Sequence, residues 1–184
     1  MKTLAWILAA PLLASCQLWP AASVAAPVQA AATTRQVAPP WPAPADPLPG
    51  LRAAHIEDYL QLAGGSHIHA HLSVFYDGVP VTVPASLGMD PHGIFIAPLH
   101  THTPTGVLHL QAPPGKTYTL GQIFAVWGVS LQGAAVFDHG EAVAEPQSYV
   151  VQDHHEVVVA YGTLPPRIPV EYNGWLCIDW SLCE

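Results

Sequence analysis

Residues 66–76 alternate strictly between apolar and polar side chains, which is typical of a β-strand with one buried face. The apolar positions are Ile68, Ala70, Leu72 and Val74. The polar positions between them are His67, His69, His71 and Ser73. Asp77-Gly78 is a strong type I′ turn sequence, and it would place Val74 opposite Val81 on a returning strand. The stretch therefore predicts a hairpin with one apolar face and one face that carries imidazoles.

A second hairpin is predicted in residues 96–110, IAPLHTHTPTGVLHL. The turn Thr103-Pro104-Thr105-Gly106 has proline at its second position and glycine at its fourth, as turns prefer. Symmetric pairing about this turn places His100 opposite His109. His100 and His102 share a face because strand side chains alternate with a period of two. All three imidazoles are therefore expected on one side of the ribbon.

Two segments have the periodicity of helices. Residues 119–128 combine a capping box, Thr119 with Gln122, and an apolar stripe that ends at Gly128. The stripe consists of Leu120, Ile123, Phe124 and Trp127. Residues 51–63 place a second apolar face on a helix that Gly64 and Gly65 would end. That face consists of Ile56, Tyr59, Leu60 and Ala63.

The rest of the C-terminal half consists of short β-rich segments, such as GAAVFDHG and HHEVVVAYG, separated by turn sequences. Together with the two hairpins they predict a mainly β fold. The expected architecture is a compact β-sandwich or half-barrel with one or two short helices.

The histidines form the candidate functional site. Imidazole is a common ligand of transition metals, and each H-x-H pair on a strand presents two rings on one face. Two such pairs on adjacent strands, joined by a cross-strand third ring, can enclose an ion. The expected ligands are His67, His69, His100, His102 and His109. A pH-sensitive polar patch without metal and a set of unrelated histidines are the alternatives.

Other histidines are weaker candidates. His71 extends the first row of rings but lies far along it, and His92 lies in a loop that could close the site. The roles of His139, His154 and His155 stay open. The cluster suits Cu(II), Zn(II), Ni(II) or Fe(II). A location outside the cytoplasm, which the N-terminal sequence implies, favours copper over zinc, although the spacing itself does not decide between them.

The N-terminus directs the chain out of the cytoplasm. Lys2 precedes a short apolar run, and Leu13-Ala14-Ser15-Cys16 resembles the lipobox of bacterial lipoproteins. The resemblance implies a signal peptide over residues 1–15 and a lipid anchor at Cys16, whereas an ordinary secretory peptide would be cut further on. Alanine and proline dominate residues 16–50, which predicts an extended tether before a folded domain at residues 51–184. The protein is expected in the cell envelope, facing the periplasm or the exterior.

Charge and cysteine content narrow the possible partners. The formal net charge is −8, and the chain has only five Lys and Arg residues. Such a chain cannot neutralise many phosphates, which excludes nucleic acid as a partner. Cys177 and Cys183 are expected to form a disulfide in an oxidising compartment, with a pair of thiol ligands as the alternative.

Residues 64–131 resemble stretches in secreted or membrane-anchored prokaryotic proteins of unassigned function. The similar segments are SHIHAHLSVFYDGVPVTVP, IAPLHTHTPTGVLHL and YTLGQIFAVWGV. The resemblance implies the same five histidines as ligands. It departs at Thr103, where an acidic residue often follows the second H-x-H pair, and His71 is often replaced.

Three functions remain open from the sequence. The first is a metal-binding lipoprotein that buffers or delivers an ion. The second is a metal-dependent enzyme with an open histidine-ligated site, for which the sequence identifies no catalytic residue. The third is a structural or partner-binding envelope domain without metal.

Overall fold

The computed structural model describes residues 37–56 and 66–175. All of them belong to one compact unit, which spans residues 33–184. Among these described residues, no helix is long and apolar enough to cross a membrane.

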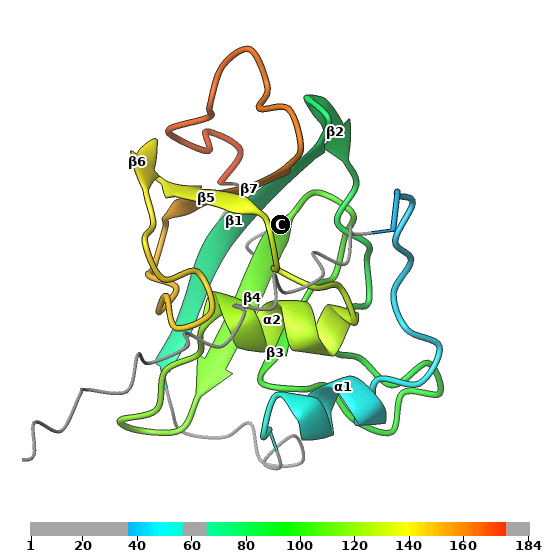
Figure 1. Cartoon of the computed structure of the whole chain (residues 1–184). Helices are drawn as coiled ribbons and strands as arrows, with labels where there is room; N and C mark the ends of the chain where they lie inside the picture. Colours follow the sequence, from blue (N-terminus) through cyan, green and yellow to red (C-terminus); the bar gives the residue numbers. More distant parts are fainter. Residues whose placement is uncertain (1–36, 57–65, 176–184) are drawn as a thin grey trace, which may run out of the picture. The chain divides into compact units, whose positions relative to one another are not determined.

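Seven strands form one open mixed sheet (Figure 1). Its order is β3-β4-β1-β7-β5-β6, and β2 pairs with the end of β1. The strands are β1 (Ser66–Tyr76), β2 (Val79–Val81), β3 (Leu99–His100), β4 (Val107–Ala112), β5 (Ala135–Asp138), β6 (Glu141–Ala142) and β7 (Glu156–Tyr161). Only the pairing of β1 with β7 is parallel. The mainly β class is confirmed, and the sheet packs against helices.

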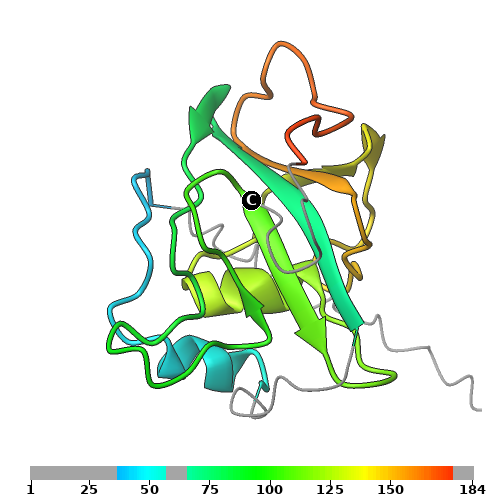
Figure 2. The ribbon, with the colours of Figure 1, turned by 180° about the vertical axis from the view of Figure 1, so that it is seen from behind.

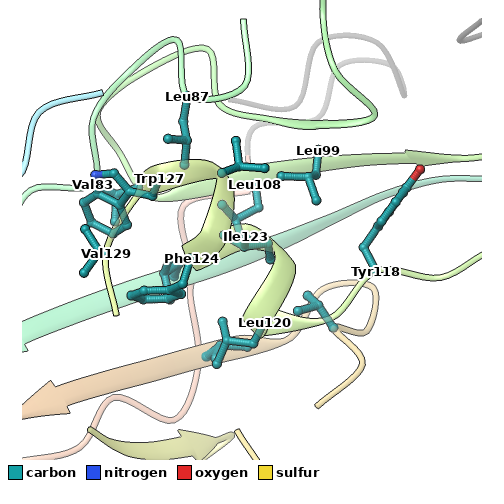
Figure 3. Packing of buried hydrophobic residues seen from close by; sticks show 14 of the residues in the cluster. Val83, Leu87, Leu99, Leu108, Tyr118, Leu120, Ile123, Phe124, Trp127 and Val129 are labelled. Atoms are coloured by element: carbon teal, nitrogen blue, oxygen red, sulfur yellow. The ribbon is translucent and has the colours of Figure 1, made fainter. Parts of the chain in front are cut away.

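The described residues form two helices, α1 (Leu48–Ala53) and α2 (Leu120–Trp127). The capping box of Thr119 and Gln122 is present, and Gly128 ends α2 in the left-handed conformation, as predicted. The predicted apolar stripe of α2 is buried, and it packs on one face of the sheet (Figure 3). Figure 2 shows the opposite side, with β1 and β4 in front of α2.

The N-terminal helix differs from its prediction. It covers Leu48–Ala53 and has already ended at Ala54, so Ile56 lies beyond it, although Ile56 is fully buried. The helix has proline in its first turn, where the missing N–H removes no hydrogen bond. Tyr59, Leu60 and Ala63, which were expected on the same face, lie outside the described residues.

Trp41 belongs to the stretch that composition assigns to a tether, yet it is part of the core. Its side chain is 8% exposed, and its ring packs edge-on against those of Trp127 and Tyr161, with centroids 6.0 and 5.4 Å away. The indole N–H of Trp127 donates to the carbonyl of Trp41 at 3.0 Å. One large aromatic residue thus supplies the apolar area that the surrounding prolines and alanines lack.

Both predicted hairpin registers are present. Val74 pairs with Val81, and His100 pairs with His109. The second turn depends on Gly106, whose φ of 91° disfavours other residues. A Cβ at Gly106 would lie 2.6 Å from the carbonyl oxygen of Leu72. The turn therefore approaches β1 as closely as its backbone allows.

We expect Gly106→Ala to destabilise the fold by about 2–4 kcal/mol, through backbone strain plus a collision with β1. Gly115→Ala is the matched control, because Gly115 also has a positive φ, of 78°, but nothing lies within 4 Å of its added Cβ. It should cost only about 1 kcal/mol. Urea denaturation measures both variants. Equal losses would show that the close approach contributes nothing.

Candidate metal centre

Three neighbouring strands place one histidine each in a row across the sheet. His69 on β1 pairs with His109 on β4, and His109 pairs in turn with His100 on β3. Directly paired residues have Cβ atoms about 4.5–5.5 Å apart, which is close enough for their rings to meet. The row exists because two registers, β1 with β4 and β4 with β3, both bring a histidine to the same level.

Each H-x-H pair adds a further ring to this row. His67 lies two residues before His69 on the same face of β1, and its ring centroid is 4.5 Å from that of His69. His102 follows the end of β3, and its ring lies edge-on to that of His109 at 4.5 Å. All five predicted ligands therefore gather around His109, on the face of the sheet opposite α2.

The central rings are removed from water. His69, His109 and His100 are 0%, 2% and 3% exposed, whereas His67 is half-buried and His102 is exposed. Both ring nitrogens of His69 are buried with no hydrogen-bond partner among the described residues. An unsatisfied buried polar group costs about 1–3 kcal/mol, so such a ring calls for an explanation. A bound cation would take the lone pair of one of the two nitrogens.

A backbone hydrogen bond orients His100. Its Nδ1–H donates to the carbonyl of Ala97 at 2.8 Å, which leaves the lone pair on Nε2. That Nε2 atom lies 3.2 Å from Nε2 of His102. Metal-binding histidines usually have their second ring nitrogen fixed in this way, because the outer hydrogen bond sets the tautomer.

The nitrogen separations match those of a tetrahedral site. Nε2 of His67 lies 3.4 Å from Nδ1 of His109, and the His100–His102 separation is 3.2 Å. Two nitrogens on a tetrahedral ion with bonds of about 2.0–2.1 Å lie about 3.3–3.4 Å apart. These separations lie near the upper limit for hydrogen bonds, and they also match two edges of a coordination tetrahedron.

Loss of hydration keeps the cluster neutral. Burial, together with the other histidines, lowers the pKa of His109 from 6.5 to about 3. Burial likewise lowers the pKa of His69 and of His100 to about 4, and it lowers the pKa of His67. Neutral imidazole is the form that binds metals, so the rings are ready to act as ligands at neutral pH.

The five histidines form two groups. The ligand nitrogens of His67, His69 and His109 all lie within 4.8 Å of one another, and so do those of His100, His102 and His109. Both groups could hold a metal ion. His109 belongs to both, because its strand lies between β1 and β3.

His71 is committed to other partners. Its Nε2–H donates to the carbonyl of Thr105 at 2.8 Å, and its Nδ1 lies 2.6 Å from a carboxylate oxygen of the buried Glu156. Its ring also stacks on Tyr172 at 3.8 Å. These contacts tie β1 to β7 and to the turn before β4, so His71 serves the fold. His92 is exposed and belongs to neither histidine group.

A third group of potential ligands lies elsewhere, and sequence reasoning did not assemble it. It consists of Asp138, His139 and His155, whose ligand atoms also lie within 4.8 Å of one another. Nδ1 of His155 lies 2.9 and 3.0 Å from the two carboxylate oxygens of Asp138. The sequence of a strand followed by DHG placed Asp138 and His139 at a turn, but only the pairing of β5 with β7 brings His155 to them.

Asp153 and His154 lie beside the backbone of His69. Asp153 accepts a hydrogen bond from the backbone N–H of His69 at 2.9 Å, so its carboxylate supports β1. His154 pairs with Asp153 at 3.0 Å. Cys16, Cys177 and Cys183 lie outside the described residues, so the lipid anchor and the disulfide stay predictions.

In metal-free protein, stability should fall as the pH drops from 6.5 toward 4. The folded pKa values of His69, His100 and His109 lie below the unfolded value of 6.5, so the unfolded chain binds protons that the folded chain cannot. The contribution of these three histidines to the free energy of unfolding is complete above pH 6.5 and declines below it. His109→Leu should lessen this slope by up to about 1.4 kcal/mol per pH unit. Urea titrations with a chelator measure it, and identical slopes in both proteins would contradict the assignment.

Comparison of the chain with protein-family models, with curated proteins and with solved structures gave no match. The site itself consists of buried histidine clusters that could hold a transition-metal ion.

Proposed function

We propose that this protein is an extracytoplasmic lipoprotein that binds a transition-metal ion through its histidine cluster and buffers or delivers that ion. One observation carries the proposal. His69 is fully buried with neither ring nitrogen satisfied by the described residues, and it lies between two other imidazoles. A metal ion is the partner that would satisfy a neutral, desolvated imidazole in this setting.

The burial of the cluster favours binding over catalysis. Catalytic metal sites keep a coordination position open to water or substrate, and a nearby group usually handles protons. Here His69, His100 and His109 are at most 3% exposed. The nearby carboxylate of Asp153 accepts a hydrogen bond from the backbone N–H of His69. Storage or transfer of an ion is compatible with a buried site, whereas an enzyme would need a coordination position that water or substrate can reach.

Zinc and copper are the two candidate metals. The location outside the cytoplasm favours copper, as the sequence suggested. The nitrogen separations of 3.2 and 3.4 Å favour a tetrahedral ion such as Zn(II). Square-planar Cu(II) would bring neighbouring nitrogens to about 2.9 Å. We therefore propose zinc first and copper second.

The N-terminal sequence supports a location in the cell envelope. The resemblance of Leu13-Ala14-Ser15-Cys16 to a lipobox implies a lipid on Cys16, and a Pro- and Ala-rich stretch follows it. Each CH₂ group of an acyl chain that inserts into the membrane contributes about 0.8 kcal/mol to membrane binding. The net charge of −8 would draw cations toward the protein.

Metal analysis of the purified full chain tests the binding function. After incubation with Zn(II) or Cu(II) and removal of free ion, we expect stoichiometric metal. His69→Leu, which fills a similar volume, should weaken binding at least tenfold, because it removes a fully buried ligand. His92→Gln is the control and should bind as the original chain does, since His92 belongs to neither histidine group. Absence of metal in all proteins would leave only the structural alternative.

Membrane fractionation tests the location. With Cys16 intact, the protein should sediment with membranes, and Cys16→Ser should move it to the soluble fraction or block its processing. An alkaline wash removes weakly adsorbed protein from the membranes but leaves lipid-anchored protein in place. A Cys16→Ser protein that is processed and still sediments as the original does would contradict lipid attachment at Cys16.

A further inference from the structure

We propose that the histidine cluster holds two metal ions, one on each side of His109, and that the imidazole of His109 bridges them. This inference rests on the proposed metal-binding function and adds the number of ions and the arrangement of their ligands. One ion lies among His67, His69 and His109, and the other lies among His100, His102 and His109.

The spacing of the ligand atoms argues against a single ion for all five rings. The ligand nitrogens of one tetrahedral ion all lie about 3.4 Å or less from one another. The described histidines instead fall into two groups of three that meet the wider limit of 4.8 Å, and no larger group meets it among the described residues. A single ion could use only one of these groups.

The position of His109 suits it for bridging. Its strand, β4, lies between β1 and β3, so one H-x-H pair flanks it on each side. Its Nδ1 faces Nε2 of His67 at 3.4 Å. Its ring lies edge-on to that of His102, at 88° and 4.5 Å. An imidazole has its two nitrogens on different edges of the ring, so each can face a different pair.

Apart from His67, whose Nε2 lies 3.4 Å from its Nδ1, the ring of His109 has no hydrogen-bond partner among the described residues. Its close ring neighbours are the imidazoles of His69, His100 and His102. By contrast, the Nδ1 of His100 is used by Ala97. When both ions bind, the ring N–H proton of His109 leaves to solvent, and each nitrogen then donates one lone pair to one ion.

The two positions differ in access to solvent. The group on the β1 side contains His69, which is fully buried, whereas the group on the β3 side contains His102, which is exposed. The ion on the β3 side should therefore exchange faster. A buried ion that stays and an outer ion that exchanges would suit a protein that passes metal to a partner.

Metal stoichiometry tests the two-ion arrangement. The full chain carries His139→Asn throughout, because the third group of ligands could add an ion, and asparagine tolerates the positive φ of 47° there. We expect two Zn(II) per chain. His67→Gln and His102→Gln should each bind one, and His92→Gln should bind two. The His67→Gln protein should lose its remaining ion to a chelator faster than the His102→Gln protein.

The outcomes separate this inference from the proposed function. One ion per chain, weakened alike by His67→Gln and His102→Gln, would overturn the two-ion arrangement but keep metal binding. No ion in any protein would overturn both.

Electron paramagnetic resonance gives a second test that needs no variant in the site. Two Cu(II) ions joined by an imidazole are magnetically coupled, so the protein loaded with two Cu(II) should show less than two spins per chain at low temperature. Replacement of one copper by zinc should restore one full spin. Two uncoupled spins would contradict the bridge.

Discussion

The structure depends on one register: His69, His109 and His100 lie side by side on three adjacent antiparallel strands. In a sheet, a slip of one residue turns every side chain to the opposite face. A slip of β4 would send His109 into the apolar core beneath α2 and bring a leucine among the imidazoles. Burial of the apolar face and the gathering of the histidines on the other face therefore require the same register. The close turn at Gly106 adds a further constraint on that register.

Burying these imidazoles is unfavourable for the isolated domain. Desolvation lowers their pKa values, and the buried nitrogens of His69 lose hydrogen bonds to water without gaining others from the described residues. The hydrophobic contacts of α2 with the sheet offset that cost on the other face. Such a cluster of neutral rings could hold a cation, because binding would require no proton release from most of them.

Local patterns predicted the hairpins and the main helix, but not the order of the strands. The turn sequences at Asp77-Gly78 and Thr103–Gly106 act between neighbouring segments, so Val74↔Val81 and His100↔His109 followed from them. The pairing of β1 with β4 and the parallel pairing of β1 with β7 are contacts between distant segments, and no turn specifies them. For that reason Glu156 beside His71, the group around Asp138 and the packing of Trp41 were not predicted.

X-ray absorption spectroscopy of the zinc-loaded full chain tests the central claim most directly. We predict a first shell of nitrogen at about 2.0 Å with the outer scattering of at least three imidazole rings. A shell dominated by oxygen would mean that zinc binds at surface carboxylates. A sulfur shell at about 2.3 Å would assign the ion to cysteine thiolates, and either result would contradict a metal centre built on the row of His69, His109 and His100.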